Sequence, residues 1–220
     1  MATESKRTTR PTIVHGGQTY NTVQIGSQCW LKENLNIGTK INGSGNQTNN
    51  SIIEKYCYSD LESNCNIYGG LYQWNEMMAY VTTAGVQGIC PSGWHIPTNA
   101  EWCTVTQFLD PTVNCGILGW SGTNAGGKMK STGTIEAETG LWYSPNTGAT
   151  NESGFSADPA GYRSYNGLFY VIDLYGYWWS SSAYYTGGAL YRTVVYDRGS
   201  VGRFNLNKSC GFSVRCLRDF

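Results

Sequence analysis

The chain has 220 residues, which is enough for one large domain or two small ones with a sizeable core. Its 15 basic and 15 acidic residues cancel, which disfavours nucleic-acid or membrane-surface binding through bulk charge. Low charge, many aromatic residues and many glycines predict a compact, loop-rich protein containing β-structure. The sequence has no apolar run approaching the ~20 residues that span a bilayer, so direct membrane insertion is not expected. The polar N-terminus lacks the apolar region of a signal peptide, although a chain whose leader had been removed would look the same.

Eight cysteines are scattered along the chain, and only two histidines accompany them. Because no pair of cysteines has C-x-x-C spacing, a zinc site is not expected. An even number of scattered cysteines favours disulfides and an oxidising compartment. Buried free thiols in a reducing compartment are the alternative.

In chain order, residues 1–12 read as a flexible tail, and residues 20–30 alternate apolar and polar side chains as a half-buried strand does. Residues 69–80 follow a Gly-Gly break and have helical spacing. The spaced residues of this segment, which we expect in the core, are Leu71, Trp74, Met77 and Met78.

A second helix is predicted over residues 96–109, because Thr98 and Glu101 form a capping box. Its apolar stripe consists of Trp102, Val105 and Leu109. Residues 110–165 read as long irregular structure pinned by single buried side chains, and short β segments follow residue 167. Two helices, long loops and a C-terminal β region predict the α+β class. We see no linker, so we expect one domain over residues 13–220.

The sequence contains no G-x-S-x-G elbow, Walker loop, HExxH motif or Rossmann fingerprint, and it signals no paired general acid and base. His95, beside aromatic and proline residues, is expected to be packed and hydrogen-bonded rather than catalytic. Asn151, Glu152 and Asp158 offer oxygen ligands for calcium, but loop-capping hydrogen bonds are the preferred interpretation. We therefore predict a non-enzymatic protein without a cofactor, with calcium as an open alternative.

The stretch 180–207, "SSSAYYTGGALYRTVVYDRGSVGRFNLN", contains no Lys, Glu, Gln, Met or Trp. The other 192 residues contain 35 of these five types. The stretch is instead rich in Tyr, Ser, Gly and Arg, so its composition calls for an explanation.

Seven segments carry a family resemblance: "TVQIGSQCWLKENLN" (22–36), "YGGLYQWNEMM" (68–78), "GICPSGWHIPTNAEW" (88–102), "AGGKMKSTGT" (125–134), "WYSPNTGATNESGFSADPAGYR" (142–163), "GYWWSSS" (176–182) and "NKSCGFSVRCLRD" (207–219). In this order, over residues 13–219, the chain resembles the Fibrobacter succinogenes major paralogous domain. The resemblance implies a C-type lectin-like fold related to formylglycine-generating enzymes, in bacterial surface or secreted proteins. Domains of this type also serve as variable proteins of diversity-generating retroelements, whose C-terminal β region is diversified at template adenines.

Adenine-directed mutation explains the missing residue types. Mutating the adenines of an AAC codon produces NNC codons, which cannot encode Lys, Glu, Gln, Met or Trp. Where related sequences have an Asn-rich run before the last cysteine, this chain reads "RFNLNKSCGFSVRC", so that Phe204, Leu206 and Cys210 would be products of diversification. The alternative is a β region that lacks five residue types by chance.

The diversified stretch is compatible with a hairpin of strands over 189–197 and 200–206, with a turn at 197–200. Side chains alternate across a strand, so the variable residues would share one face and the adjoining loop. The predicted variable surface, about residues 180–210, consists of Tyr184, Tyr185, Gly187, Gly188, Leu190, Tyr191, Thr193, Val195, Asp197, Arg198, Gly202, Phe204, Leu206 and Cys210. The alternate residues, which would serve the scaffold, are Arg192, Val194, Val201 and Arg203. Tyr, Ser, Gly and Arg also dominate antibody paratopes, whereas sheet packing is the alternative role for each tyrosine.

The resemblance also implies scaffold residues: Trp178 and Trp179, and a last strand on which Phe212, Val214 and Cys216 alternate inward. It implies disulfides Cys90–Cys216 and Cys57–Cys65, and Cys103–Cys115 fits with its spacing of 12. Pairing cannot be proven from sequence. Cys29 and Cys210 are left over.

The favoured function is a binding protein that presents a variable surface to a protein ligand or surface receptor. A glycan is the less favoured ligand, because the acidic and Asn-Pro motifs of calcium-dependent lectins are missing. Its expected location is extracellular, on a cell or on a virion. The alternatives are a formylglycine-generating-type oxidase, with Cys210 and Cys216 as its reactive pair, and an invariant bacterial surface domain.

Overall fold

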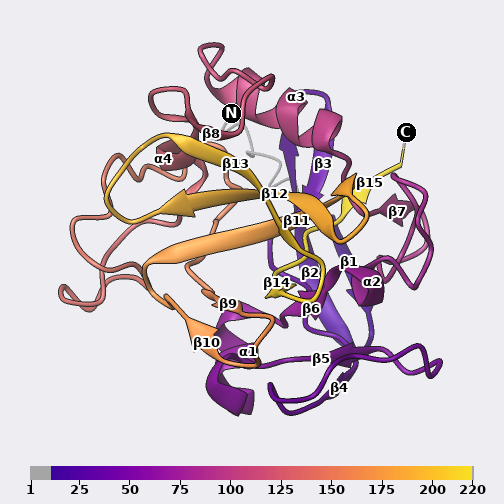
Figure 1. The fold of residues 1–220 in the computed structure, drawn as a ribbon. Helices are drawn as coiled ribbons and strands as arrows, with labels where there is room; N and C mark the ends of the chain where they lie inside the picture. The colour runs from indigo at the N-terminus through magenta and orange to yellow at the C-terminus, as the bar shows by residue number, and fades with distance from the viewer. Residues whose placement is uncertain (1–10, 220) are drawn as a thin grey trace, which may run out of the picture.

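The computed structural model describes residues 11–219, so most of the predicted tail lies outside the described residues. Residue 12 departs from the prediction, since Thr12 is the first residue of strand β1. Helices and strands are mixed with long loops, which confirms the α+β class (Figure 1). That residues 13–220 form one domain stays a prediction. No helix of the described part combines the length and apolarity needed to cross a bilayer.

Four helices and one 3-10 turn are present in residues 11–219, where the sequence predicted two helices. They are η1 (Tyr58–Asp60), α1 (Glu62–Tyr68), α2 (Trp74–Met77), α3 (Asn99–Leu109) and α4 (Ala125–Met129). The predicted 69–80 helix shrinks to α2, because residues 72–73 pair as a strand and residues 79–80 adopt positive φ. Its four spaced apolar residues are nevertheless buried, as predicted.

Helix α3 begins as the sequence predicts. The Thr98 hydroxyl accepts the backbone N–H of Glu101, and the Glu101 carboxylate accepts the backbone N–H of Thr98. This reciprocal capping satisfies two N–H groups that a helix start leaves without partners. The stripe of α3 faces the core, since Trp102, Val105 and Leu109 are all buried.

One antiparallel sheet joins the two ends of the chain. Its strands, in spatial order, are β1 (Thr12–His15), β2 (Gln18–Ile25), β3 (Gln28–Leu31), β15 (Leu217–Arg218) and β7 (Trp94–His95). The single strand predicted over 20–30 is wrong: it is the β2–β3 hairpin, which turns at Gly26 with a φ of +59°. A positive φ is easy for glycine, which has no Cβ to clash.

A second antiparallel sheet carries the C-terminal β region. Its order is β11 (Tyr175–Tyr185), β12 (Gly188–Val195), β13 (Val201–Asn207) and β8 (Gly119–Ser121). The predicted hairpin of strands over 189–197 and 200–206 is therefore confirmed, with a turn that is longer than predicted and lies between Val195 and Val201. In Figure 1 this sheet crosses the molecule, with α3 and the first sheet beside it.

Smaller sheets complete the fold. One has the order β10 (Phe169–Tyr170), β9 (Tyr162–Arg163), β14 (Gly211–Phe212) and β6 (Tyr72–Gln73), and a parallel pair joins β4 (Thr39–Lys40) to β5 (Glu54–Lys55). The predicted last strand is thus split into β14 and β15. Its inward residues are buried as predicted, but so are the intervening Ser213 and Arg215, because the segment is covered on both sides.

Tryptophan rings fill much of the core. Trp30 and Trp102 lie 4.7 Å apart between ring centroids, and Trp179 stacks on Phe212 at 4.2 Å. Trp178 and Trp179 are each 1% exposed, which confirms them as interior residues. The indole N–H of Trp178 donates to Asn34 Oδ1 and that of Trp179 donates to the Tyr72 carbonyl. Both buried N–H groups therefore have hydrogen-bond partners, which avoids the free-energy cost of burying an unpaired polar group.

Three disulfides are present in residues 11–219, and they are the three pairs predicted: Cys57–Cys65, Cys90–Cys216 and Cys103–Cys115. Two free cysteines remain, a partly exposed Cys29 and a buried Cys210. Three disulfides fit an oxidising, extracellular environment.

Candidate functional site

The β11–β12–β13–β8 sheet presents one face built from alternate residues of its strands. Tyr177 lies opposite Thr193, Thr193 opposite Gly202, and Gly202 opposite Trp120. Residues directly opposite in antiparallel strands share a face. The sequence predicted that residues 193, 195 and 197 share one face of their strand and residues 202, 204 and 206 one face of the partner strand. The pairing of Thr193 with Gly202 confirms this for the residues inside the strands, whereas Asp197 lies beyond the end of β12.

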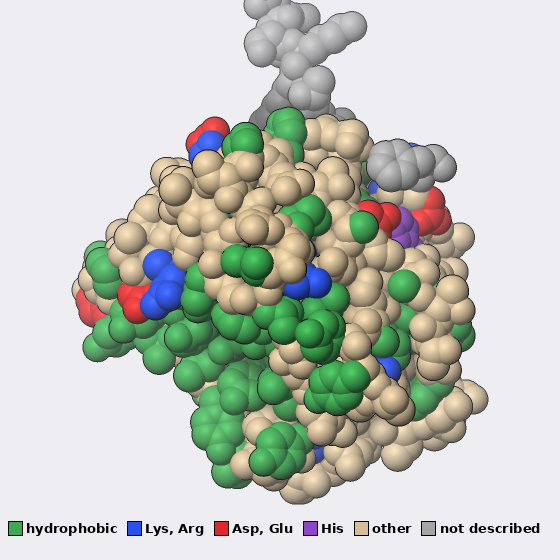
Figure 2. Space-filling model, turned by 45° about the horizontal axis from the view of Figure 1, so that its top comes forward, with side chains coloured by type: hydrophobic (Ala, Val, Ile, Leu, Met, Phe, Trp, Pro, Cys, Tyr) green, Lys and Arg blue, Asp and Glu red, His purple; other side chains and the backbone are tan. Residues whose placement is uncertain are grey.

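Six aromatic rings form a continuous row, which begins on this face and continues onto strands β9 and β10 of the neighbouring sheet. We call this row the aromatic band. Going along it, ring centroids are separated by 5.8, 6.0, 5.7, 5.2 and 5.7 Å. The band consists of Trp120, Phe204, Tyr191, Tyr177, Tyr162 and Tyr170, all of them partly or fully exposed. In Figure 2, hydrophobic side chains gather into one continuous area over this side of the molecule.

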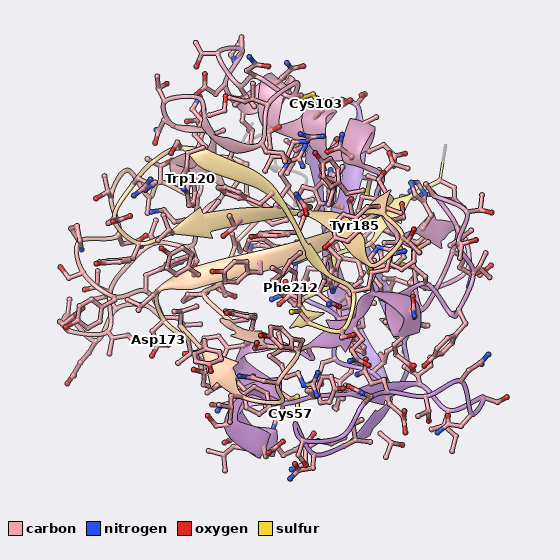
Figure 3. All side chains as sticks on the ribbon, viewed as in Figure 1. Cys57, Cys103, Trp120, Asp173, Tyr185 and Phe212 are labelled. Carbon is pink, nitrogen blue, oxygen red and sulfur yellow. A yellow bond between two sulfur atoms is a disulfide. The ribbon has the colours of Figure 1, made fainter. Side chains whose placement is uncertain are left out.

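The band is held by what lies beneath it. Phe212 is fully buried, and its ring lies 5.0 Å from Tyr177 and 4.9 Å from Tyr191. A Cβ at Gly202 would come within 2.8 Å of the Phe204 ring and 3.2 Å of the Trp120 ring. Glycine at position 202 therefore lets these two rings meet. Figure 3 labels Trp120 near one end of the sheet and Tyr185 at the hairpin at the other end.

The electrostatics of the face favour contact rather than chemistry. Burial raises the pKa of Tyr177 and of Tyr191 above the usual value, so both hydroxyls stay protonated as donors. At the Trp120 end, Arg198 lies over the Trp120 ring at 4.7 Å and forms an ion pair with Asp197 at 3.2 Å. The band thus offers flat aromatic area and hydroxyl donors with little net charge.

The predicted variable residues divide by exposure. Five are exposed: Tyr184, Tyr185, Gly187, Asp197 and Arg198. Three are partly exposed within or beside the band: Tyr191, Phe204 and Leu206. Six are buried, contrary to the expectation of a surface position: Gly188, Leu190, Thr193, Val195, Gly202 and Cys210.

The reasons for burial differ. Leu190 lies opposite Asn205, on the sheet face away from the band. Thr193 points to the band side, where it lies between Tyr177 and Gly202 on the neighbouring strands, but it is only 2% exposed. Cys210 belongs to the main hydrophobic core together with Phe212.

Four members of the band were not predicted: Trp120, Tyr162, Tyr170 and Tyr177. The alternation of Tyr175, Tyr177 and Trp179 was a usable signal, because it places residue 177 on one face with residues 191 and 193 once β11 pairs with β12. Trp120 and Tyr162 carried no such signal, since each comes from a short strand within a long irregular region.

His95 is hydrogen-bonded as predicted. Its Nδ1 lies 2.6 Å from Asp219 Oδ1, and its Nε2 lies 2.9 Å from Glu101 Oε1. The Glu101 hydrogen bond raises the pKa of His95 and outweighs the effect of burial. Both nitrogens are thus occupied by structural partners.

The calcium candidates serve loop contacts. Asn151 and Ser156 bond to each other, Glu152 lies 3.7 Å from Lys128 Nζ, and Asp158 accepts from Ser131 Oγ at 2.6 Å. Within residues 11–219, one group of three His, Cys, Asp or Glu side chains has ligand atoms close enough to hold a metal. It is Cys57, Glu62 and Cys65, and its two sulfurs are bonded to each other.

The sulfurs of the oxidase alternative are not paired with each other. Cys216 is bonded to Cys90, and the thiol of Cys210 is fully buried. Burial also raises the pKa of Cys210, which disfavours a thiolate.

Fold and site together define a class: a disulfide-bonded α+β protein that presents an aromatic sheet face. The family model of the Fibrobacter succinogenes major domain matches residues 23–218. The chain therefore belongs to this family, as the seven sequence segments predicted. No match was found among curated proteins or among solved structures.

Proposed function

We propose that this chain is a non-enzymatic ligand-binding protein of the diversity-generating retroelement type, with a C-type lectin-like scaffold and a variable region at about residues 180–210. One observation carries the proposal. The stretch that lacks five residue types supplies two adjacent rings in the middle of the aromatic band. Tyr191 and Phe204 stand inside the band, and Leu206 adjoins it on β13.

The chemistry of the face supports a protein ligand or surface receptor as partner. Tyrosine and tryptophan are enriched at the energetic centres of protein interfaces, because they bury a large area at little entropic cost. A glycan is less favoured, since within residues 11–219 no cluster of carboxylates forms a calcium site near the band. Three disulfides support an extracellular location, on a cell or virion surface.

The scaffold supports variation at the face. Trp178 and Trp179 alternate across β11 and are anchored in the core. By contrast, Tyr184 and Tyr185 in the β11–β12 hairpin and Arg198 in the β12–β13 turn are exposed and are not core residues. Such positions tolerate substitution because they bury little area. The oxidase alternative gains no support, because Cys216 is engaged in a disulfide.

The test is to sequence the genomic neighbourhood in a population of the source organism. We expect a reverse-transcriptase gene and a near-duplicate of the DNA for residues 180–216 that differs from this gene only where the duplicate has adenines. Codons for Tyr184, Tyr185, Tyr191 and Phe204 should vary, and those for Trp178 should not. A single invariant copy across the population would reject diversification and leave the invariant surface domain.

A further inference from the structure

On the sheet face away from the aromatic band, two arginines converge on one asparagine. Arg192 on β12 and Arg203 on β13 lie directly opposite each other. Arg192 Nη1 donates to Asn99 Oδ1 at 3.0 Å, and Arg203 Nε donates to the same oxygen at 2.9 Å. The two guanidinium groups are therefore immediate neighbours.

Neither arginine has a counter-charge among residues 11–219. No carboxylate of this part lies within 4.0 Å of either guanidinium. Arg192 is only 2% exposed, and burial together with the charge of Arg203 lowers its pKa to about 9. Buried charges in proteins are normally paired, because desolvation is costly. Two adjacent like charges without an anion are thus an unbalanced arrangement.

The pair also has donors to spare and a route to solvent. Arg203 is partly exposed, and its Nη1 donates to the Ile117 carbonyl at 3.0 Å. Within the described residues, its Nη2 and the Nε of Arg192 have no acceptor. Asn99 is the first residue of α3, and its backbone N–H already donates to Ser182 Oγ at 2.9 Å, so the arginines supply the free donors of this site.

We propose that Arg192, Arg203 and the start of α3 form a binding site for a compact oxyanion, a carboxylate, phosphate or sulfate group. The anion contacts the exposed edge of Arg203 and neutralises the field of the buried Arg192. A free ion and an acidic group carried by a larger ligand share this chemistry. The site does not depend on the aromatic band or on diversification.

The experiment titrates the intact protein with sodium sulfate, phosphate or acetate at constant ionic strength. Arginine Nε–Hε resonances in proton–nitrogen NMR spectra report binding, and the melting temperature is followed in parallel. Concentrations stay below roughly 20 mM, where general salt effects on hydration are small. Two variants accompany the wild type: Arg203→Gln, and Arg198→Gln as a matched control from the exposed β12–β13 turn.

We expect saturable shifts of the Arg192 and Arg203 resonances and a saturable rise in melting temperature. Arg203→Gln should weaken binding at least about tenfold, because a charge-assisted hydrogen bond is lost. Arg198→Gln should bind as the wild type does. Saturation with sulfate or phosphate but not acetate would assign the site to tetrahedral anions, and saturation with all three would assign it to oxyanions in general.

The proposal is overturned if none of the three ions gives saturable shifts in the wild-type protein, a measurement that needs no variant to fold. It is equally overturned if binding persists unchanged in Arg203→Gln. Because the readout involves neither the aromatic band nor sequence variation, its failure leaves the proposed function untouched.

Discussion

Lys130 is the most informative single position for testing how the turn beside the aromatic band is held. Its side chain is fully buried at the end of α4. The ammonium donates to the carbonyls of Thr147 at 2.9 Å, Val195 at 2.9 Å and Arg198 at 3.1 Å. Lys130 therefore connects the irregular loop at Thr147 with the end of β12 at Val195 and with the β12–β13 turn at Arg198.

Lys130→Met keeps most of the volume and removes all three donors. Each buried carbonyl left without a partner costs about 1–3 kcal/mol, and removing a desolvated charge offsets part of the total. We expect a loss of about 3–5 kcal/mol in the free energy of unfolding. Urea denaturation measures it, as a midpoint shift of roughly 1 M or more at unchanged slope.

Lys128→Met is the matched control from the same helix. Lys128 Nζ donates to one carbonyl, that of Leu109, and its side chain is 29% exposed. Its loss should cost less than about 1 kcal/mol. If Lys130→Met were as mild as this control, the three carbonyls would be solvated and the reasoning would be refuted.

Three further predictions concern titration, cross-links and thiols. The carboxylate partners of His95 raise its pKa, so its ion pairs stabilise the fold below pH 6.5, and this contribution is lost as the pH rises through the raised value. His95→Gln should therefore flatten the dependence of the free energy of unfolding on pH, which unfolding curves at several pH values measure. Replacing Cys90 and Cys216 by alanine opens a loop spanning 126 residues and should lower the free energy of unfolding by about 5 kcal/mol, and a loss under 1 kcal/mol would contradict the cross-link. A thiol reagent should label Cys29 in the native protein and Cys210 only after unfolding, so native labelling of both would refute the burial of Cys210.

Local signals account for the elements that could be predicted. A capping box determines where α3 begins, because it satisfies N–H groups within one turn of chain. Two alternating segments around a short turn determined the β12–β13 hairpin and which residues share a face. The family resemblance supplied the disulfide pairs, which spacing alone leaves open.

The periodicity of apolar side chains predicted the wrong structure in two segments, because another feature interrupted the helix or strand. Residues 69–80 have helical spacing, yet pairing with β14 takes residues 72–73 into a strand. Residues 20–30 alternate throughout, but a glycine with positive φ folds them into a hairpin. At residues 72–73 a tertiary contact outweighed a local preference of a few tenths of a kcal/mol per residue, whereas at residues 20–30 a local turn interrupted the strand.

The sequence by itself determined the family and the facing of the C-terminal strands, and the family resemblance in turn implied the disulfide pairs. Tertiary structure alone decided which of those residues reach solvent, because alternation assigns a face but not what covers it. Thr193 and Phe204 point to the same side, and only the larger ring emerges. The aromatic band likewise assembles residues from separate strands and loops, and Asn99 of α3 joins the Arg192–Arg203 pair, through contacts that no local pattern encodes.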